Sequence, residues 1–144
     1  MSKREGDITL GGLTIWIDQR QFPESKDYWD ANWTNANVVY DCPEARVRTS
    51  APIIHLGDLD RWLHDLKTLN STLVGEANLE CVEPNLRVLM EASSLGHIQV
   101  RVELTPDHLY QGHWFEFEAD QSYLPPLIKN LTDVLTKFPI VGTP

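Results

Sequence analysis

Between Ala77 and Ala119 the chain carries four runs in which apolar and polar residues alternate, and only short turns separate the first three. Alternation places the apolar side chains on one face of a strand. Parallel neighbours need a crossover of about a dozen residues or more, so short connections favour antiparallel pairs. The segment therefore predicts consecutive antiparallel strands with one buried face. Its apolar positions are Ala77, Leu79 and Cys81; Leu86, Val88 and Met90; Ile98, Val100, Val102 and Leu104; and Phe115 and Phe117.

A leucine-rich stripe with helical spacing precedes these strands. Apolar residues recur every three or four positions from Leu56 to Leu73, while charged residues occupy the opposite side. This pattern predicts an amphipathic helix of about three to four turns. We expect Gly57 or Asp58 to cap it, because a small or acidic residue suits the free N–H groups of a first turn.

A second apolar stripe closes the chain between Leu124 and Phe138. The pair Pro125-Pro126 fits a helix only in its first turn, where the missing N–H groups break no hydrogen bond. We expect Asp120 or Ser122 to cap this helix and Pro139 to end it.

The N-terminal part of the chain adds further strand patterns. Residues 8–17 alternate on either side of Gly11-Gly12, which predicts a strand pair or a bulged strand. Residues 22–37 follow neither period, and we interpret them as a structured loop. Residues 38–40 and 46–49 flank an acidic, proline-containing turn at 41–44, as a hairpin does.

The expected order of elements, β-β-β-α-β-β-β-β-α, is typical of the α+β class. We expect one domain over residues 1–144, a size at which a single core is usual. Its expected architecture is an antiparallel β-sheet of about 6–8 strands with two α-helices packed on one face.

The charge of the chain is strongly acidic. Twelve Lys and Arg stand against 21 Asp and Glu, a formal net charge of −9, and no Lys or Arg occurs from Val102 to Ile128. Such a surface repels phosphate backbones and anionic lipids but attracts a basic protein. Direct binding of nucleic acid or membrane is therefore not expected. A general solubility function of the acidic residues stays open beside a binding function.

Sequence patterns of catalysis and of metal binding are absent. The two cysteines lack CxxC spacing, the five histidines form no HExxH motif, and neither GxSxG, GxxxxGK[ST] nor GxGxxG occurs. Glu116 and Glu118 alternate on one strand face, as solvated carboxylates commonly do. We therefore expect no catalytic residue, no metal site, no cofactor and no enzymatic activity. The N-terminus has no apolar run of signal-peptide type, so we expect a cytoplasmic protein.

Aromatic residues offer candidate contacts with a partner. Trp29 and Trp33 lie in the aperiodic segment, where they either plug an edge of the core or present a binding anchor. Trp114 lies on the outward face of an acidic strand, with the same two interpretations. The candidate partner-binding residues are Glu103, Asp107, Trp114, Glu116, Glu118, Trp29 and Trp33.

Four short segments occur in an order and spacing that resemble the WapI family of immunity proteins, from about Ile8 to Phe138. The resemblance implies a small protein that protects its producer by binding a sister toxin, a secreted polymorphic protein of nuclease type. It implies no catalytic residue. The segments are Asp27-Tyr28-Trp29-Asp30-Ala31-Asn32-Trp33, Leu59-x3-Leu63-x2-Leu66, Glu83-Pro84-Asn85-Leu86, and Asp120-Gln121-Ser122-Tyr123-Leu124 with the later Phe138-Pro139.

Two other functions stay open on the sequence. A generic interaction or regulatory domain, including a homo-oligomer that pairs through a sheet edge or its helix faces, has the same composition. An enzyme or small-ligand binder requires a deep pocket with convergent polar groups.

Overall fold

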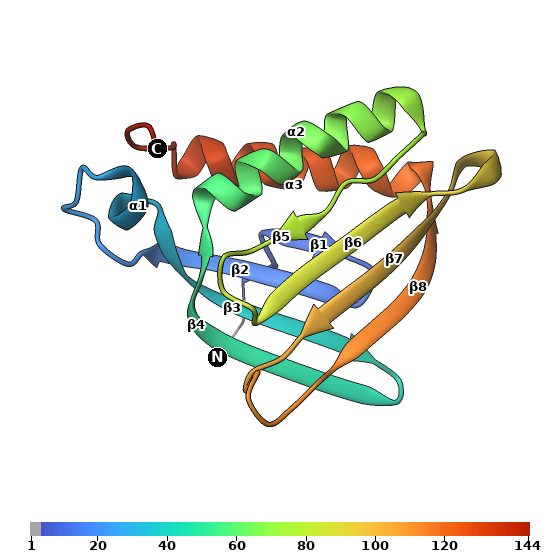
Figure 1. Ribbon diagram of the computed structural model, residues 1–144, viewed down its shortest axis with the longest axis horizontal. Helices are drawn as coiled ribbons and strands as arrows, with labels where there is room; N and C mark the ends of the chain where they lie inside the picture. The colour runs from blue at the N-terminus through green and yellow to red at the C-terminus, as the bar shows by residue number, and fades with distance from the viewer. Residues whose placement is uncertain (1–3) are drawn as a thin grey trace.

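The structure, a computed structural model, describes residues 4–144, and within this range eight strands form two antiparallel sheets (Figure 1). Each sheet has its four strands in chain order. The first contains β1 (Ile8–Leu10), β2 (Leu13–Arg20), β3 (Trp33–Cys42) and β4 (Ala45–His55). The second contains β5 (Leu79–Glu80), β6 (Leu86–Ala92), β7 (His97–Leu104) and β8 (Trp114–Asp120).

The helices connect and cover these sheets. Helix α2 (Leu56–Thr72) leads from β4 to the second sheet, and α3 (Leu124–Lys137) lies beside it along one side of the molecule (Figure 1). The shorter elements are α1 (Tyr28–Ala31) and the 3-10 turns η1 (Ser94–Gly96) and η2 (Gln121–Tyr123). The α+β class, the number of strands and the pairing of two long helices are confirmed.

One continuous apolar cluster joins both sheets and both long helices. The sheets meet where Tyr40 of β3 stacks on Phe115 of β8, with ring centroids 4.1 Å apart and an interplanar angle of 12°. The strands thus divide between two sheets that share a core, because α2 separates the two groups of hairpins along the chain. The hairpins at Gly11-Gly12 and Pro43-Glu44 have the antiparallel pairing that was expected.

The prediction of a loop over residues 22–37 is wrong for its second half. Residues 28–31 form α1, and β3 begins at Trp33. The first inward residues of β3 are Thr34 and Ala36, one polar and one small, so no apolar alternation marks the strand. Thr34 is satisfied in the core because its hydroxyl donates to the carbonyl of Ile54 at 2.7 Å.

The predicted cap of α2 is also wrong. His55, the last residue of β4, occupies the N-cap, and its Nδ1 accepts the N–H of Gly57 at 3.0 Å. The strand therefore runs into the helix with no spacer, and Asp58 is buried inside the first turn. The helix has 17 residues, longer than the expected three to four turns.

The second helix follows its prediction more closely. Pro125 and Pro126 lie in the first turn of α3, and the helix ends at Lys137, shortly before Pro139. Asp120 does act as a cap, but for a different helix from the one predicted. Its carboxylate accepts the N–H of Ser122 at 2.8 Å and caps η2 instead of α3.

Candidate partner-binding surface

The outer face of the second sheet collects four of the seven candidate residues. The register of β7 and β8 places Glu103 opposite Trp114, Arg101 opposite Glu116, and Gln99 opposite Glu118. Because side chains alternate across a strand, all of these groups share one face of the sheet. The inner face of β8 carries Phe115 and Phe117, which pack against the core.

Arg101 organises the centre of this face. Its Nε donates to Glu103 Oε2 at 2.9 Å and its Nη1 to Glu116 Oε1 at 3.0 Å. The hydrogen bonds to Glu103 and then to Glu116 raise the pKa of the Arg101 guanidinium above its usual value. The guanidinium carbon also lies 4.3 Å from the centroid of the Trp114 ring, a cation–π contact. Trp114, which is 56% exposed, is thereby held in place on an open surface.

The remaining charges of the face are partly paired across strands. His97 Nδ1 lies 2.6 Å from Glu118 Oε1, and Arg87 Nη2 lies 2.8 Å from Glu80 Oε1. None of these basic residues was among the candidates chosen from the sequence. Alternation marks Arg101 and His97 as outward residues of β7, but the long loop 105–113 leaves the register with β8 undetermined.

A groove of about 550 Å³ runs over this face of the sheet. Leu89 and Arg101 line its floor, and carboxylates outnumber arginines along it. Its carboxylates belong to Glu76, Glu80, Glu91 and Glu116. A mainly polar groove with more carboxylates than arginines is suited to contact a basic protein surface.

Asp107 lies beyond the end of β7, in loop 105–113. Its carboxylate accepts the N–H of Leu109 at 3.1 Å. We call Glu103, Asp107, Trp114, Glu116 and Glu118 the sheet surface, because the loop returns directly into β8 at Trp114.

Trp29 and Trp33 belong to a different part of the molecule. Together with Tyr28 they surround His55, at ring-centroid distances of 5.5, 5.1 and 5.1 Å for Trp29, Trp33 and Tyr28. Figure 1 shows α1 on the opposite side of the molecule from β8. Trp33 is half-buried, and Trp29 is 51% exposed. These four residues form the α1 cluster, and the seven candidates thus divide between two separate surfaces.

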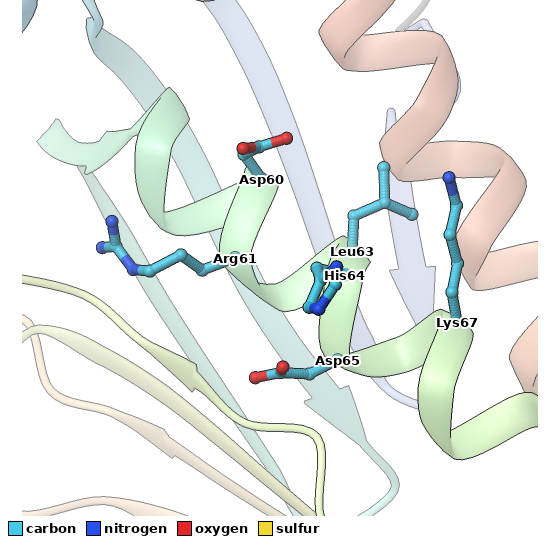
Figure 2. A pocket seen from close by; sticks show the side chains of 6 residues that line it. All are labelled: Asp60, Arg61, Leu63, His64, Asp65 and Lys67. Atoms are coloured by element: carbon cyan, nitrogen blue, oxygen red, sulfur yellow. The ribbon is translucent and has the colours of Figure 1, made fainter. Parts of the chain in front are cut away.

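A second hollow, of about 420 Å³, lies against α2 (Figure 2). All of its lining residues come from this one helix. Their side chains fan out in different directions, with Lys67 and Leu63 toward the neighbouring helix and Arg61 toward the strands. The charged groups therefore do not converge on a common point where a ligand would be held. The lining residues are Asp60, Arg61, Leu63, His64, Asp65 and Lys67.

Two further observations concern membrane and metal. None of the helices within residues 4–144 has the length and apolar character needed to cross a bilayer. Over the same range, His, Cys, Asp and Glu side chains do not gather in groups of three or more with a geometry that would hold a metal ion.

Comparison with known protein families identifies the family of the chain. The model of the immunity protein WapI-like family matches residues 4–139. The chain belongs to the WapI-like immunity protein family. No curated protein and no solved structure matches it. Membership indicates a toxin-immunity role and, in general, a protein partner, the toxin.

Residues that carried the resemblance to the WapI-like family hold the fold together. The buried Asn32 side chain bonds to Tyr28 and to both backbone groups of Val141. Asn85 joins two loops through its hydrogen bond to the carbonyl of Thr105 at 3.0 Å, and Asp120 caps η2. The recognisable segments are therefore mainly structural, while the exposed residues of the sheet surface lie between them.

Proposed function

We propose that this WapI-like protein is a non-enzymatic immunity protein that binds and neutralises a cognate secreted polymorphic toxin of nuclease type. It acts in the cytoplasm of the cell that produces both proteins. The observation that carries this proposal is the family match over residues 4–139, which includes both sheets and all three helices.

The charge of the sheet surface supports a basic nuclease domain as the partner. A nuclease cleft that binds phosphate groups is cationic, because counterion release by Lys and Arg drives nucleic-acid binding. The groove on the second sheet carries the opposite charge, with Glu91 and Glu76 unpaired by any base among residues 4–144. Binding of this face to the cleft blocks substrate by shape and charge and requires no chemistry.

Trp114 is the expected anchor of this contact. Aromatic and arginine side chains dominate the energetics of protein interfaces, and residues that are ordered before binding lose less entropy. Trp114 and Arg101 meet both conditions, since each restrains the other and Glu103 and Glu116 restrain Arg101.

Co-expression with the toxin encoded beside the gene tests the function. Growth that is restored by this chain supports neutralisation, and a purified complex gives the dissociation constant. Trp114→Ala and Trp29→Ala form a matched pair, because the two rings have similar exposure on different surfaces. We expect Trp114→Ala to weaken binding about tenfold or more and Trp29→Ala to change it by less than about threefold.

The outcomes distinguish an error in the proposed function from an error in the proposed binding surface. A toxin that still kills, with no complex formed, contradicts the proposed function. A complex that is weakened by Trp29→Ala and not by Trp114→Ala moves the interface to the α1 cluster and refutes the sheet surface. Thermal unfolding of both variants confirms that each is folded.

A further inference from the structure

Loop 105–113 presents two large apolar side chains to solvent at its tip. Leu109 is 74% exposed and Tyr110 86% exposed. Single exposed apolar residues are common, but here two are adjacent, in the loop that leads into β8 at the exposed Trp114. The result is an apolar projection at one end of the sheet surface, which the sequence analysis did not single out.

Local hydrogen bonds brace this loop. The carbonyl of Asp107 accepts the N–H of Gln111 at 2.9 Å, and the Asp107 carboxylate accepts that of Leu109. The N–H of Leu104 donates to the carbonyl of His113 at 3.1 Å and closes the base of the loop. The exposed side chains of the tip add nothing to the folded core, whereas hydrogen bonds that restrain the loop reduce the entropy lost on binding.

The neighbouring loop 81–85 is hydrogen-bonded to the base of loop 105–113. Thr105 N–H donates to the carbonyl of Asn85 at 2.9 Å, and the Asn85 amide returns a bond to the carbonyl of Thr105. Val82 in this loop is 61% exposed. The two loops therefore form one surface at the same end of the second sheet.

We infer that the Leu109-Tyr110 tip is an apolar anchor that inserts into a pocket of the basic toxin domain, with the sheet surface docking beside it. This inference rests on the proposed function and adds the contact that secures the complex. Tyrosine in a desolvated pocket is a frequent source of binding energy at protein interfaces.

Charge around the tip favours this occupant over a second copy of the chain. Asp107 lies in the same loop as the tip and Glu83 in the adjoining loop 81–85, and neither forms an ion pair with any residue of the described chain. Two copies joined through this end would bring these carboxylates together, which is unfavourable. A pocket rimmed by Lys or Arg accommodates both the apolar tip and its acidic flanks.

The test measures the dissociation constant of the toxin complex for the chain and for three variants. These are Leu109→Ala, Tyr110→Ala and, as a matched control, Leu95→Ala in the turn at the opposite end of the sheet, where Leu95 is 94% exposed. We expect the dissociation constant to rise at least about tenfold for Tyr110→Ala and severalfold for Leu109→Ala. Leu95→Ala should stay within about twofold of the unaltered chain. All four proteins should unfold at similar temperatures because the altered side chains are exposed.

Each outcome has one meaning. If the unaltered chain binds the toxin and both loop variants bind it as tightly, the anchor is refuted and the proposed function stands. If light scattering shows that the loop variants lose self-association while toxin affinity is unchanged, the tip serves a second copy and the inference fails. If the unaltered chain does not bind the toxin at all, the proposed function fails, and the inference fails with it.

Discussion

Asn32 is the residue at which the N-terminal loop meets the C-terminal tail. Its amide nitrogen donates to the carbonyls of Tyr28 and Val141 at 2.8 and 2.9 Å, and its Oδ1 accepts the N–H of Val141 at 2.9 Å. The side chain is fully buried and Val141 is half-buried, so loss of the amide leaves backbone groups in a largely dry site. These three bonds need two donor hydrogens and one acceptor, which an uncharged amide supplies and a hydroxyl, with one hydrogen, does not.

Asn32→Ala should therefore lower the free energy of unfolding by about 1–3 kcal/mol, the effect of leaving buried backbone groups without partners. Asn35→Ala is the matched control, because Asn35 lies three residues further along the chain in β3, is half-buried, and its side chain forms no hydrogen bond within the described range. The control should change stability by less than about 0.5 kcal/mol. Urea denaturation of the three proteins measures both values. Equal losses in the two variants would show that the tail contact is unimportant.

Arg101 shows at the same scale what the sequence does not reveal about the site. Its neighbours in the chain are apolar, yet three groups from β7 and β8 converge on its guanidinium. Alternation predicts which residues point outward, so Trp114, Glu116 and Glu118 were found. The contacts of Arg101 with Glu116 and Trp114 depend on the register of β7 and β8, and a long loop leaves that register open.

At the scale of elements, periodicity detects segments whose buried face consists of large apolar residues. Helices α2 and α3 and strands β6 and β7 are of this kind, and their positions followed from the sequence. The beginning of β3 buries Thr34 and Ala36, and its strand character was missed. The division into two sheets was equally hidden, since it depends on contacts between distant segments such as Tyr40 and Phe115.

The junction of β4, α2 and loop 81–85 contains a buried carboxylate. Asp58 lies in the first turn of α2 with its side chain inaccessible to solvent, and Arg61 donates to its Oδ1. Its Oδ2 forms no hydrogen bond of normal geometry within the described residues. The backbone N–H groups of Val82 and His55 nevertheless lie close enough to the carboxylate to lower its pKa. Burial raises the pKa of Asp58 more than the charges of Arg61 and His55 and these N–H groups lower it.

A raised pKa in the folded state makes stability depend on pH in a known direction. The contribution of Asp58 is fully present below its ordinary value of 3.8 and is lost as the pH rises through the higher value of the folded state. Asp58→Asn keeps the shape and the acceptor for Arg61 but does not titrate. We expect the variant to gain on the order of 1 kcal/mol relative to the unaltered chain between about pH 4 and pH 8.

Paired denaturation curves at several pH values give this difference, because other titrating groups cancel between the two proteins. A difference that is independent of pH contradicts the raised pKa. A difference of opposite sign, with the unaltered chain gaining stability as the pH rises, would show that Arg61 outweighs burial. Asp60→Asn on the exposed side of the same turn removes a carboxylate charge from the same helix and serves as the control.

At the scale of the whole molecule, the net charge of −9 acts through its distribution. The groove on the second sheet faces outward, on the side of the molecule away from the shared core, and Glu91 lies on its wall with no base within ion-pair distance in residues 4–144. Asp65 has the same charge and is also exposed, but it lies on α2, outside this groove. Long-range attraction depends on where the charges lie as well as on their sum, since potentials focus in grooves.

Glu91→Lys and Asp65→Lys therefore separate the effect of charge position from that of net charge. Each substitution changes the charge of the chain by the same amount, so the two variants have equal net charge. We expect Glu91→Lys to lower the association rate constant with a basic toxin about three- to tenfold at low salt and to flatten its dependence on ionic strength. Asp65→Lys should lower it by less than about twofold. Stopped-flow measurements over a series of salt concentrations provide these rates. Equal reductions by both substitutions would mean that net charge alone guides the encounter, and a larger reduction by Asp65→Lys would place the interface on α2.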